Sequence, residues 1–408
     1  MSYKKSSLKN GYLIMNPYVN YIIGIIDTVG YFLFKFRRKQ DKPKKIDNIL
    51  LVMFGSFGDG LLFTTVLKSI RENFPKSRID VLCNKEISII LKNNLHIDNI
   101  LISPIGWGYK YPGSSFKTCN IKHWGRFDQG YRYMVSLFKI IKILKHNNVE
   151  YDVALCFRAS FDNGILPVFL SGTVGYIIGY KTGSGGFLLD KIVEWQSGIH
   201  ETQHFLKVIQ EICPPCELNE CELFYDFEET IKELKQIFSQ IGISPKDKLV
   251  VIHPTSKEMR KSLTVEQTRN IIKKILNKTT YKILITGMLQ DLPFFGQLKL
   301  NDYRLIGLHG KLDIFQLYEL LKTAEVVFTV DTFISHLAAL SKTKTVVFWS
   351  GITDVREWGP TGGNVEVISL EEVACKKWQD CHRWCKERSC MDFDLENANI
   401  DEIIYNYL

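Results

Sequence analysis

The sequence predicts an α/β protein with two Rossmann-like domains that face a central cleft, preceded by an N-terminal amphipathic helix. Short apolar runs alternate with helical patterns, and this alternation begins twice, at Ile46–Phe54 and again at Lys248–His253. A length of 408 residues leaves room for two domains. The predicted segments are 1–45 (helix and basic segment), 46–222 (first domain), 223–395 (second domain) and 396–408 (a C-terminal helix that could pack back on the first domain).

Positive charge is concentrated at the N-terminus. Residues 1–45 hold ten Lys and Arg against two acids, whereas the rest of the chain holds 42 of each sign. Tyr18–Phe36 is apolar nearly all round, with a narrow polar stripe that includes Asp27. We therefore expect a helix lying on an anionic membrane surface, and no nucleic-acid partner. The alternatives are a spanning helix, which Asp27 disfavours, and a helix packed on its own domain or on a partner.

Ten cysteines bear on the compartment and on metal binding. The basic block follows the apolar run, which is the reverse of a secretory signal, so we expect cytoplasmic, reduced thiols. Cys375, Cys381, Cys385 and Cys390 are spaced C-x5-C-x3-C-x4-C, which is not a standard zinc pattern. The sequence leaves open whether this group holds a structural metal.

The first domain opens as strand, turn, helix and strand. The apolar run at 46–54 predicts a strand buried on both faces, and Gly55–Gly60 breaks it. A helix at 61–73 and a strand at 78–83 follow, which is the unit of a doubly wound domain. Two further strands are predicted at 151–157 and 173–178.

The second domain repeats this pattern after a join near residues 215–230. Its predicted strands are 248–253, 282–286, 325–330 and 345–349, and its predicted helices are 265–277, 313–323 and one from about 335.

The turn after the first strand carries a candidate catalytic group. Gly55, Gly58 and Gly60 allow tight backbone turning, but their spacing is not the G-x-G-x-x-G of nicotinamide binding. The carboxylate of Asp59 would repel a phosphate there, so it is better suited to take a proton from a hydroxyl group. The alternative is a helix N-cap.

Two later loops carry candidate anion-binding groups. After the strand at 248–253, Thr255 and Ser256 supply hydroxyls, and Arg260 or Lys261 supplies positive charge, which suits a diphosphate. An ordinary solvated loop is the alternative. Asp331, Thr332 and His336 follow the strand at 325–330. The alternative to a binding role is that Asp331 or Thr332 caps the next helix and that His336 is a core histidine.

His200, Glu201 and His204 match the zinc-protease pattern H-E-x-x-H. Only three letters are fixed and no clear third ligand follows, so a zinc hydrolase is a remote alternative.

Taken together, these segments resemble glycosyltransferase family 9, the ADP-heptose:lipopolysaccharide heptosyltransferase family. The resemblance runs over nearly all of residues 46–400 and depends on the order of moderately specific pieces. These pieces are ILLVMFGSFGDGLLFTTVLKSIRENFPKSRIDVLC, LVVIHPTSKEMRKSL, KILITGMLQD, LHGKLDIFQLYELLKTAEVVFTVDTFISHLAAL and TVVFWSGITDVREWGP.

The resemblance implies a GT-B fold, with the acceptor held by the first domain and the donor by the second. It implies an inverting transfer of a heptose or related sugar, without a metal or cofactor, from a nucleotide-diphosphate donor to a lipid-linked glycan such as the lipopolysaccharide core. The enzyme would then work at the inner face of the cytoplasmic membrane. Asp59 matches the catalytic base and Asp291 a ribose-binding acid. The implied donor contacts are Thr255, Ser256, Arg260, Lys261, Asp331, Thr332 and His336.

Three positions depart from the family pattern. Phe333 and Met288 stand where glycines are usual, and Asp291 replaces a glutamate. These departures leave the sugar and the nucleotide open. Phe333 also keeps open a non-catalytic sugar-nucleotide-binding protein, and a non-hydrolysing sugar-nucleotide epimerase is a further alternative because it shares the GT-B architecture.

Overall fold

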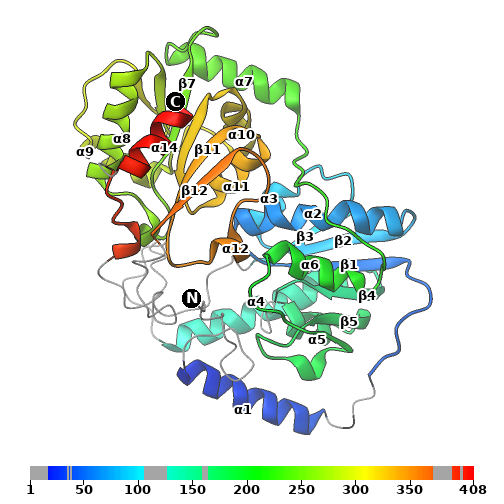
Figure 1. Ribbon diagram of the computed structural model, residues 1–408. Coiled ribbons are helices and arrows are strands. Elements are labelled where there is room, and N and C mark those ends of the chain that lie inside the picture. Colours follow the sequence, from blue (N-terminus) through cyan, green and yellow to red (C-terminus); the bar gives the residue numbers. More distant parts are fainter. Residues whose placement is uncertain are drawn as a thin grey trace. The chain divides into compact units, whose positions relative to one another are not determined.

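The computed structural model describes residues 17–34, 36, 39–104, 126–158, 164–370, 388–395 and 398–408. The chain divides into two compact units, Met1–Phe224 and Tyr225–Leu408, each built around a six-stranded parallel sheet (Figure 1). This confirms the predicted α/β class with two Rossmann-like domains. The cleft predicted between the domains stays a prediction.

The N-terminal unit has the strand order β3-β2-β1-β4-β5-β6, so the order of strands reverses between β1 and β4. Its strands are β1 (Asn48–Met53), β2 (Arg78–Cys83), β3 (Asn99–Ile102), β4 (Tyr151–Cys156), β5 (Val174–Tyr180) and β6 (Lys191–Val193). Its helices are α1 (Pro17–Leu33), α2 (Phe57–Asn73), α3 (Lys85–Ile90), α4 (Arg126–His146), α5 (Leu166–Ser171), the 3₁₀ turn η2 (Gly186–Leu188) and α6 (Glu201–Gln210).

Strand β1 is buried on both faces, which explains its uninterrupted apolar sequence. Ile49 and Leu51 join one core cluster with Phe63 of α2, whereas Leu50 joins the other with Ile140 of α4. Side chains along a strand alternate between its faces, so an apolar residue is needed at every position here.

Helix α2 begins earlier than the sequence predicts. Ser56 is its N-cap, and the side chain of Asp59 accepts a hydrogen bond from the Ser56 backbone N–H, which completes a capping box. The sequence predicted a glycine turn that extends to Gly60, but the turn ends before Phe57, where α2 begins. Gly58 and Gly60 lie inside the first turn of α2, and only Gly55 precedes the helix.

The C-terminal unit has the order β12-β11-β10-β7-β8-β9, the same doubly wound arrangement. Its strands are β7 (Leu249–His253), β8 (Lys282–Ile285), β9 (Leu305–Gly307), β10 (Val326–Val330), β11 (Lys344–Trp349) and β12 (Val365–Ser369). Its helices are α7 (Phe227–Gln240), α8 (Val265–Lys278), α9 (Leu292–Gln297), α10 (Ile314–Thr323), α11 (Phe333–Leu340), α12 (Val355–Trp358) and α14 (Ala398–Tyr407). Its 3₁₀ turns are η3 (Met259–Lys261), η4 (Leu289–Asp291) and η6 (Ser389–Met391).

Helix α14 belongs to the core of the C-terminal unit. Ile404 is fully buried in the cluster that contains Ile252 of β7 and Ile271 of α8. Lys274 of α8 also forms an ion pair with Asp401, with its Nζ atom 2.5 Å from Oδ1. From the sequence, this helix could pack back on the N-terminal domain. In the structure, its apolar residue Ile404 packs in the core of the C-terminal unit.

The cysteines give no support to a metal site in the described ranges. Cys375, Cys381 and Cys385 lie outside the described residues, and Cys390 is buried in the C-terminal core. Within the described residues, no group of three or more His, Cys, Asp or Glu side chains could hold a metal ion. Nor does any helix in those ranges reach the length and apolarity that crossing a bilayer requires.

Candidate functional site

Asp59 lies in the first turn of α2, directly beyond the carboxyl end of β1. The residue is 7% exposed. Oδ2 accepts hydrogen bonds from the Ser56 backbone N–H at 2.6 Å and from Ser56 Oγ at 2.7 Å. The helix-cap interpretation of Asp59 is therefore correct in part, at position N3 rather than at the N-cap. This bonding fixes the carboxylate at the edge of the sheet where doubly wound domains bind ligands.

Gly55 makes room for that carboxylate. A Cβ atom at Gly55 would lie 2.5 Å from Asp59 Cβ and 2.7 Å from Asp59 Oδ2, so any other residue would force the turn apart. The side chain of Asn84 holds the glycine on its other side. Asn84 Nδ2 donates to the Gly55 carbonyl at 2.9 Å, and Asn84 Oδ1 accepts from the Gly55 N–H at 3.0 Å. Sequence reasoning did not single out Asn84.

Arg158 is the principal residue of this site that sequence reasoning missed. It follows β4 and forms ion pairs with Asp59 Oδ1 and, at 2.8 Å, with Glu201 Oε1. Burial opposes its charge, but the two carboxylates outweigh burial and raise the pKa of Arg158 above its usual value. Its position beyond the carboxyl end of a buried strand was the available signal.

The zinc-protease interpretation was wrong. His200 lies outside helix α6 as its N-cap and accepts a hydrogen bond from the Thr202 N–H, so the two histidines do not share one helical face. The Glu201 carboxylate is engaged by Arg158. His204 is 2% exposed and its ring stacks on Trp195, with ring centroids 3.6 Å apart.

In the C-terminal unit, the loops after β7 and β8 meet at Thr255 and Asp291. Thr255 Oγ1 donates to Asp291 Oδ2 at 2.9 Å, and the Met288 N–H donates to the same oxygen at 2.8 Å. Thr255 is 2% exposed, whereas Asp291 is partly exposed. Two residues predicted to contact the donor are thus brought together by the register of neighbouring strands.

The loops after β7 and β10 meet at an ion pair between Lys261 and Asp331. Lys261 Nζ lies 2.8 Å from Asp331 Oδ2, which also accepts hydrogen bonds from Ser350 Oγ at 2.8 Å and Thr353 Oγ1 at 2.7 Å. Asp331 is 7% exposed. Sequence reasoning missed Ser350 and Thr353, although both lie in the loop that follows the neighbouring strand β11.

The remaining predicted donor residues lie on the same loops. Ser256 accepts from the Glu258 N–H at 3.3 Å, and Arg260 pairs with Glu258 at 2.7 Å. Thr332 is the N-cap of α11, where its side chain accepts from the Ile334 N–H, so the capping interpretation is correct for Thr332. His336 lies at the end of the first turn of α11 and is partly exposed.

A partly buried histidine near Asp291 was also missed. His253 ends β7, and its Nδ1 atom lies 2.9 Å from Thr286 Oγ1 at the end of β8. Burial lowers the pKa of His253 to about 4, against the smaller opposing effect of Asp291. The ring is therefore neutral near pH 7 and adds no charge beside the predicted donor site.

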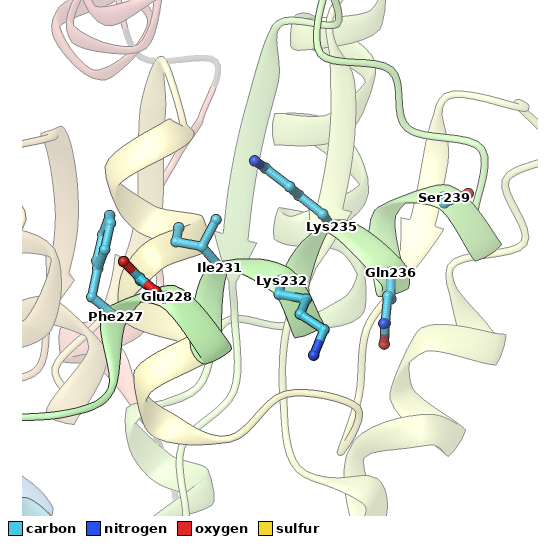
Figure 2. Close-up of a pocket in the computed structure, with 7 residues that line it drawn as sticks. All are labelled: Phe227, Glu228, Ile231, Lys232, Lys235, Gln236 and Ser239. Carbon is cyan, nitrogen blue, oxygen red and sulfur yellow. The ribbon is translucent and has the colours of Figure 1, made fainter.

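A hollow on the surface of α7 is separate from these loops. Figure 2 shows that one face of this helix lines it, with side chains from successive turns. The lining residues are Phe227, Glu228, Ile231, Lys232, Lys235, Gln236 and Ser239. None of them is a predicted catalytic or donor residue, so the hollow has no part in the candidate site.

The sequence model of glycosyltransferase family 9 (heptosyltransferase) matches residues 137–387. The chain belongs to glycosyltransferase family 9. It is therefore a glycosyltransferase of the heptosyltransferase type, and the epimerase alternative from the sequence falls away. The matched range includes Arg158, the loops after β7, β8 and β10, and the loop that contains Ser350 and Thr353.

Individual relatives of this glycosyltransferase are distant. It is 23% identical over 314 residues to lipopolysaccharide heptosyltransferase 3 of Escherichia coli K12, covering 76% of this chain and 83% of the relative. A family 9 structure from Veillonella parvula has a TM-score of 0.64 at 14% identity, covering 80% and 88% of the two chains. The E. coli heptosyltransferase WaaC with ADP has a TM-score of 0.59 at 14% identity, covering 88% and 100%. These structures support the GT-B fold.

Proposed function

We propose that this family 9 enzyme transfers a heptose or related sugar from a nucleotide-diphosphate donor to a lipid-linked glycan such as the lipopolysaccharide core. Family membership supports the reaction class. Two relatives support the choice of acceptor and donor, lipopolysaccharide heptosyltransferase 3 by its name and the E. coli heptosyltransferase WaaC by its structure with ADP. The observation that carries the proposal is the convergence of the predicted donor residues at two contacts, Thr255 with Asp291 and Lys261 with Asp331.

The proposed chemistry is a single inverting displacement in which Asp59 is the general base. Asp59 takes the proton of an acceptor hydroxyl group as its oxygen attacks the anomeric carbon. The bond from that carbon to the diphosphate breaks on the opposite face, and the diphosphate leaves with the bonding electrons. The bonds from Ser56 and Arg158 support this role because they hold the carboxylate in one orientation before substrate binds.

The donor diphosphate is proposed to bind at the loops after β7 and β10. Thr255 and Ser256 supply hydroxyl donors, Arg260 and Lys261 supply positive charge, and the N-terminus of α11 supplies backbone N–H groups near Thr332. Charge that develops on the departing diphosphate is then stabilised by protein groups, so the proposed reaction needs no metal ion. We place the reaction at the inner face of the cytoplasmic membrane, where lipid-linked glycans are assembled.

The test is transfer from a panel of nucleotide sugars to a lipopolysaccharide acceptor, with Asp59→Asn compared against wild type. General-base catalysis contributes roughly 10²- to 10⁴-fold. Turnover should fall by about that factor, while donor binding, measured by thermal shift, persists. Asp47→Asn is a matched control because Asp47 is a surface carboxylate of the same unit, paired with Lys45. Equal turnover in Asp59→Asn and wild type would refute the base assignment. No transfer by wild type with any donor would favour the non-catalytic binding protein.

A further inference from the structure

Helix α1 is docked on the rest of the N-terminal unit through a buried carboxylate. Asp27 is 7% exposed, and its Oδ1 accepts hydrogen bonds from Ser184 Oγ at 2.7 Å and from the Gly185 N–H at 3.0 Å. Ser184 and Gly185 belong to the loop between β5 and η2. A carboxylate buried on an otherwise apolar helix is costly unless it is hydrogen-bonded, and these two donors satisfy it.

Aromatic packing continues the same docked face. Gly30 lies one turn beyond Asp27, and a Cβ atom there would lie 2.3 Å from the ring of Phe187. Phe34 follows a further turn on, with its ring centroid 5.5 Å from that of Phe187 and 5.7 Å from that of Phe169. Beyond the helix, the Gln40 N–H donates to Asp190 Oδ1 at 3.0 Å, so the chain after α1 is also attached to this unit.

The opposite face of α1 is apolar and exposed. Ile25, Val29, Phe32 and Leu33 are 47%, 49%, 76% and 69% exposed, and they recur at the three- and four-residue steps that place side chains on one side of a helix. A water-soluble helix normally shows the reverse arrangement, with its apolar face on the protein and its polar face outward. Asp27, the acidic residue of the narrow polar stripe read from the sequence, thus points inward.

We infer that α1 is a lipid-docking helix, held on the N-terminal unit through Asp27, whose outward apolar face inserts into the interfacial region of an anionic bilayer. Apolar side chains on one face of an interfacial helix enter the boundary between headgroups and acyl chains. The segment that follows carries Lys39, Lys42 and Lys44, which are all exposed and suit negatively charged headgroups. A second copy of the chain fits this face less well, because two basic segments would then repel each other.

This inference rests on the proposed function in one respect. A lipid-linked acceptor explains why the enzyme would need to be held at a membrane surface. The geometry also implies orientation. A helix attached through hydrogen bonds and ring contacts moves with its domain, so lipid binding would present the whole N-terminal unit to the membrane in one pose. A flexible tether would leave that pose unspecified.

The test is flotation of the full-length protein with lipid vesicles. Wild type should float with vesicles containing phosphatidylglycerol, and less with pure phosphatidylcholine or at high salt. Phe32→Ser should reduce vesicle binding at least ~10-fold, because a fully inserted aromatic side chain contributes roughly that factor or more. Leu95→Ser is the matched control, because Leu95 is 75% exposed on the same unit and Phe32 is 76% exposed. The control should float as wild type does.

Three results would overturn the inference. Wild type could fail to float with anionic vesicles, or Phe32→Ser could float as well as wild type. A dimer of wild type that Phe32→Ser converts to monomer, without vesicle binding, would show that a second copy covers this face. A second assay, transfer to a delipidated, soluble acceptor, separates this inference from the proposed function. Phe32→Ser should retain transfer to this acceptor. A wild type that floats with vesicles but transfers no sugar contradicts only the proposed function.

The attachment through Asp27 has its own test. Asp27→Ala removes the acceptor for Ser184 and Gly185, so trypsin should cleave faster at Lys39 and Lys44, while Asp27→Asn, which keeps an acceptor oxygen, should change cleavage less. Unchanged cleavage in Asp27→Ala would overturn the docked orientation.

Discussion

Lys261 Nζ lies 2.8 Å from Asp331 Oδ2, and this contact joins the loops after β7 and β10. Asp331 also accepts hydrogen bonds from Ser350 and Thr353, which belong to the loop after β11. Three loops are therefore tied together through one carboxylate. The lysine proposed to face the donor diphosphate is already held in place by this carboxylate, which reduces the side-chain entropy lost when an anion binds.

Lys261→Met should weaken binding of nucleotide diphosphates by about 10- to 100-fold, because a charge-assisted hydrogen bond contributes roughly 1.5–3 kcal/mol. Isothermal titration with a panel of nucleoside diphosphates measures this effect. Lys257→Met is the matched control, since Lys257 is an exposed lysine of the same loop and should leave affinity near the wild-type value. If both substitutions weaken binding equally, Lys261 has no special part in holding the diphosphate.

Arg158→Gln should lower the free energy of unfolding by about 3–5 kcal/mol, because it leaves the carboxylates of Asp59 and Glu201 buried without their cation. Adding Glu201→Gln removes one of these charges, so the double variant should recover part of the loss. Urea denaturation measures both changes. A double variant less stable than Arg158→Gln alone would contradict this account of the cluster.

Gly55→Ala should lower turnover sharply while the protein stays folded. The added Cβ atom would lie 2.5 Å from Asp59 Cβ and displace the carboxylate. A misplacement of about 1 Å at a reacting group can cost on the order of 100-fold in rate. Steady-state kinetics and thermal melting give the two values. Gly24→Ala is a suitable control, since a Cβ atom there meets nothing within 4 Å. Wild-type turnover in Gly55→Ala would show that the turn adapts.

Stability should fall as the solution becomes acidic. Burial lowers the pKa of His204 to about 3, with smaller contributions from Lys207 and Arg158. The unfolded chain takes up this proton below about pH 6.5 and the folded chain does not, so the contribution is complete above that pH and declines toward pH 3. At about pH 4.5 the loss is about 2.7 kcal/mol, because each pH unit between the two pKa values contributes about 1.36 kcal/mol.

The urea midpoint followed against pH checks this expectation. His204→Phe keeps an aromatic ring on Trp195 and removes the titrating nitrogen, so its midpoint should fall less between about pH 7 and pH 4.5. His146→Gln, at an exposed histidine of the same unit, is the control. A slope in His204→Phe identical to wild type would assign the acid sensitivity to other groups.

The central strands could be predicted from the sequence, whereas the edge strands could not. β1, β4, β7 and β10 are short, almost wholly apolar runs because both of their faces are buried. The four strands that the sequence analysis did not predict are β3, β6, β9 and β12, and each lies at an edge of its sheet. These edge strands are less buried than the central ones, so their sequences lack the apolar signal.

The loop residues of the candidate site were predictable for a related reason. Parallel strands place all their carboxyl ends at one edge of the sheet, so polar residues that follow apolar runs mark that edge before any coordinates exist. Their partners were not predictable in this way. Arg158 reaches Asp59, and Ser350 reaches Asp331, only through contacts between segments that are distant in the chain.

By itself, the sequence determined the two α/β units, the candidate loops and an apolar helix beside a basic segment, because each depends on periodicity or local order. Only the tertiary structure decided which charges neutralise one another and which face of α1 points outward. Periodicity separates the polar from the apolar side of a helix but does not say which side meets the protein. Here the hydrogen bonds of Asp27 with Ser184 and Gly185 settle that orientation.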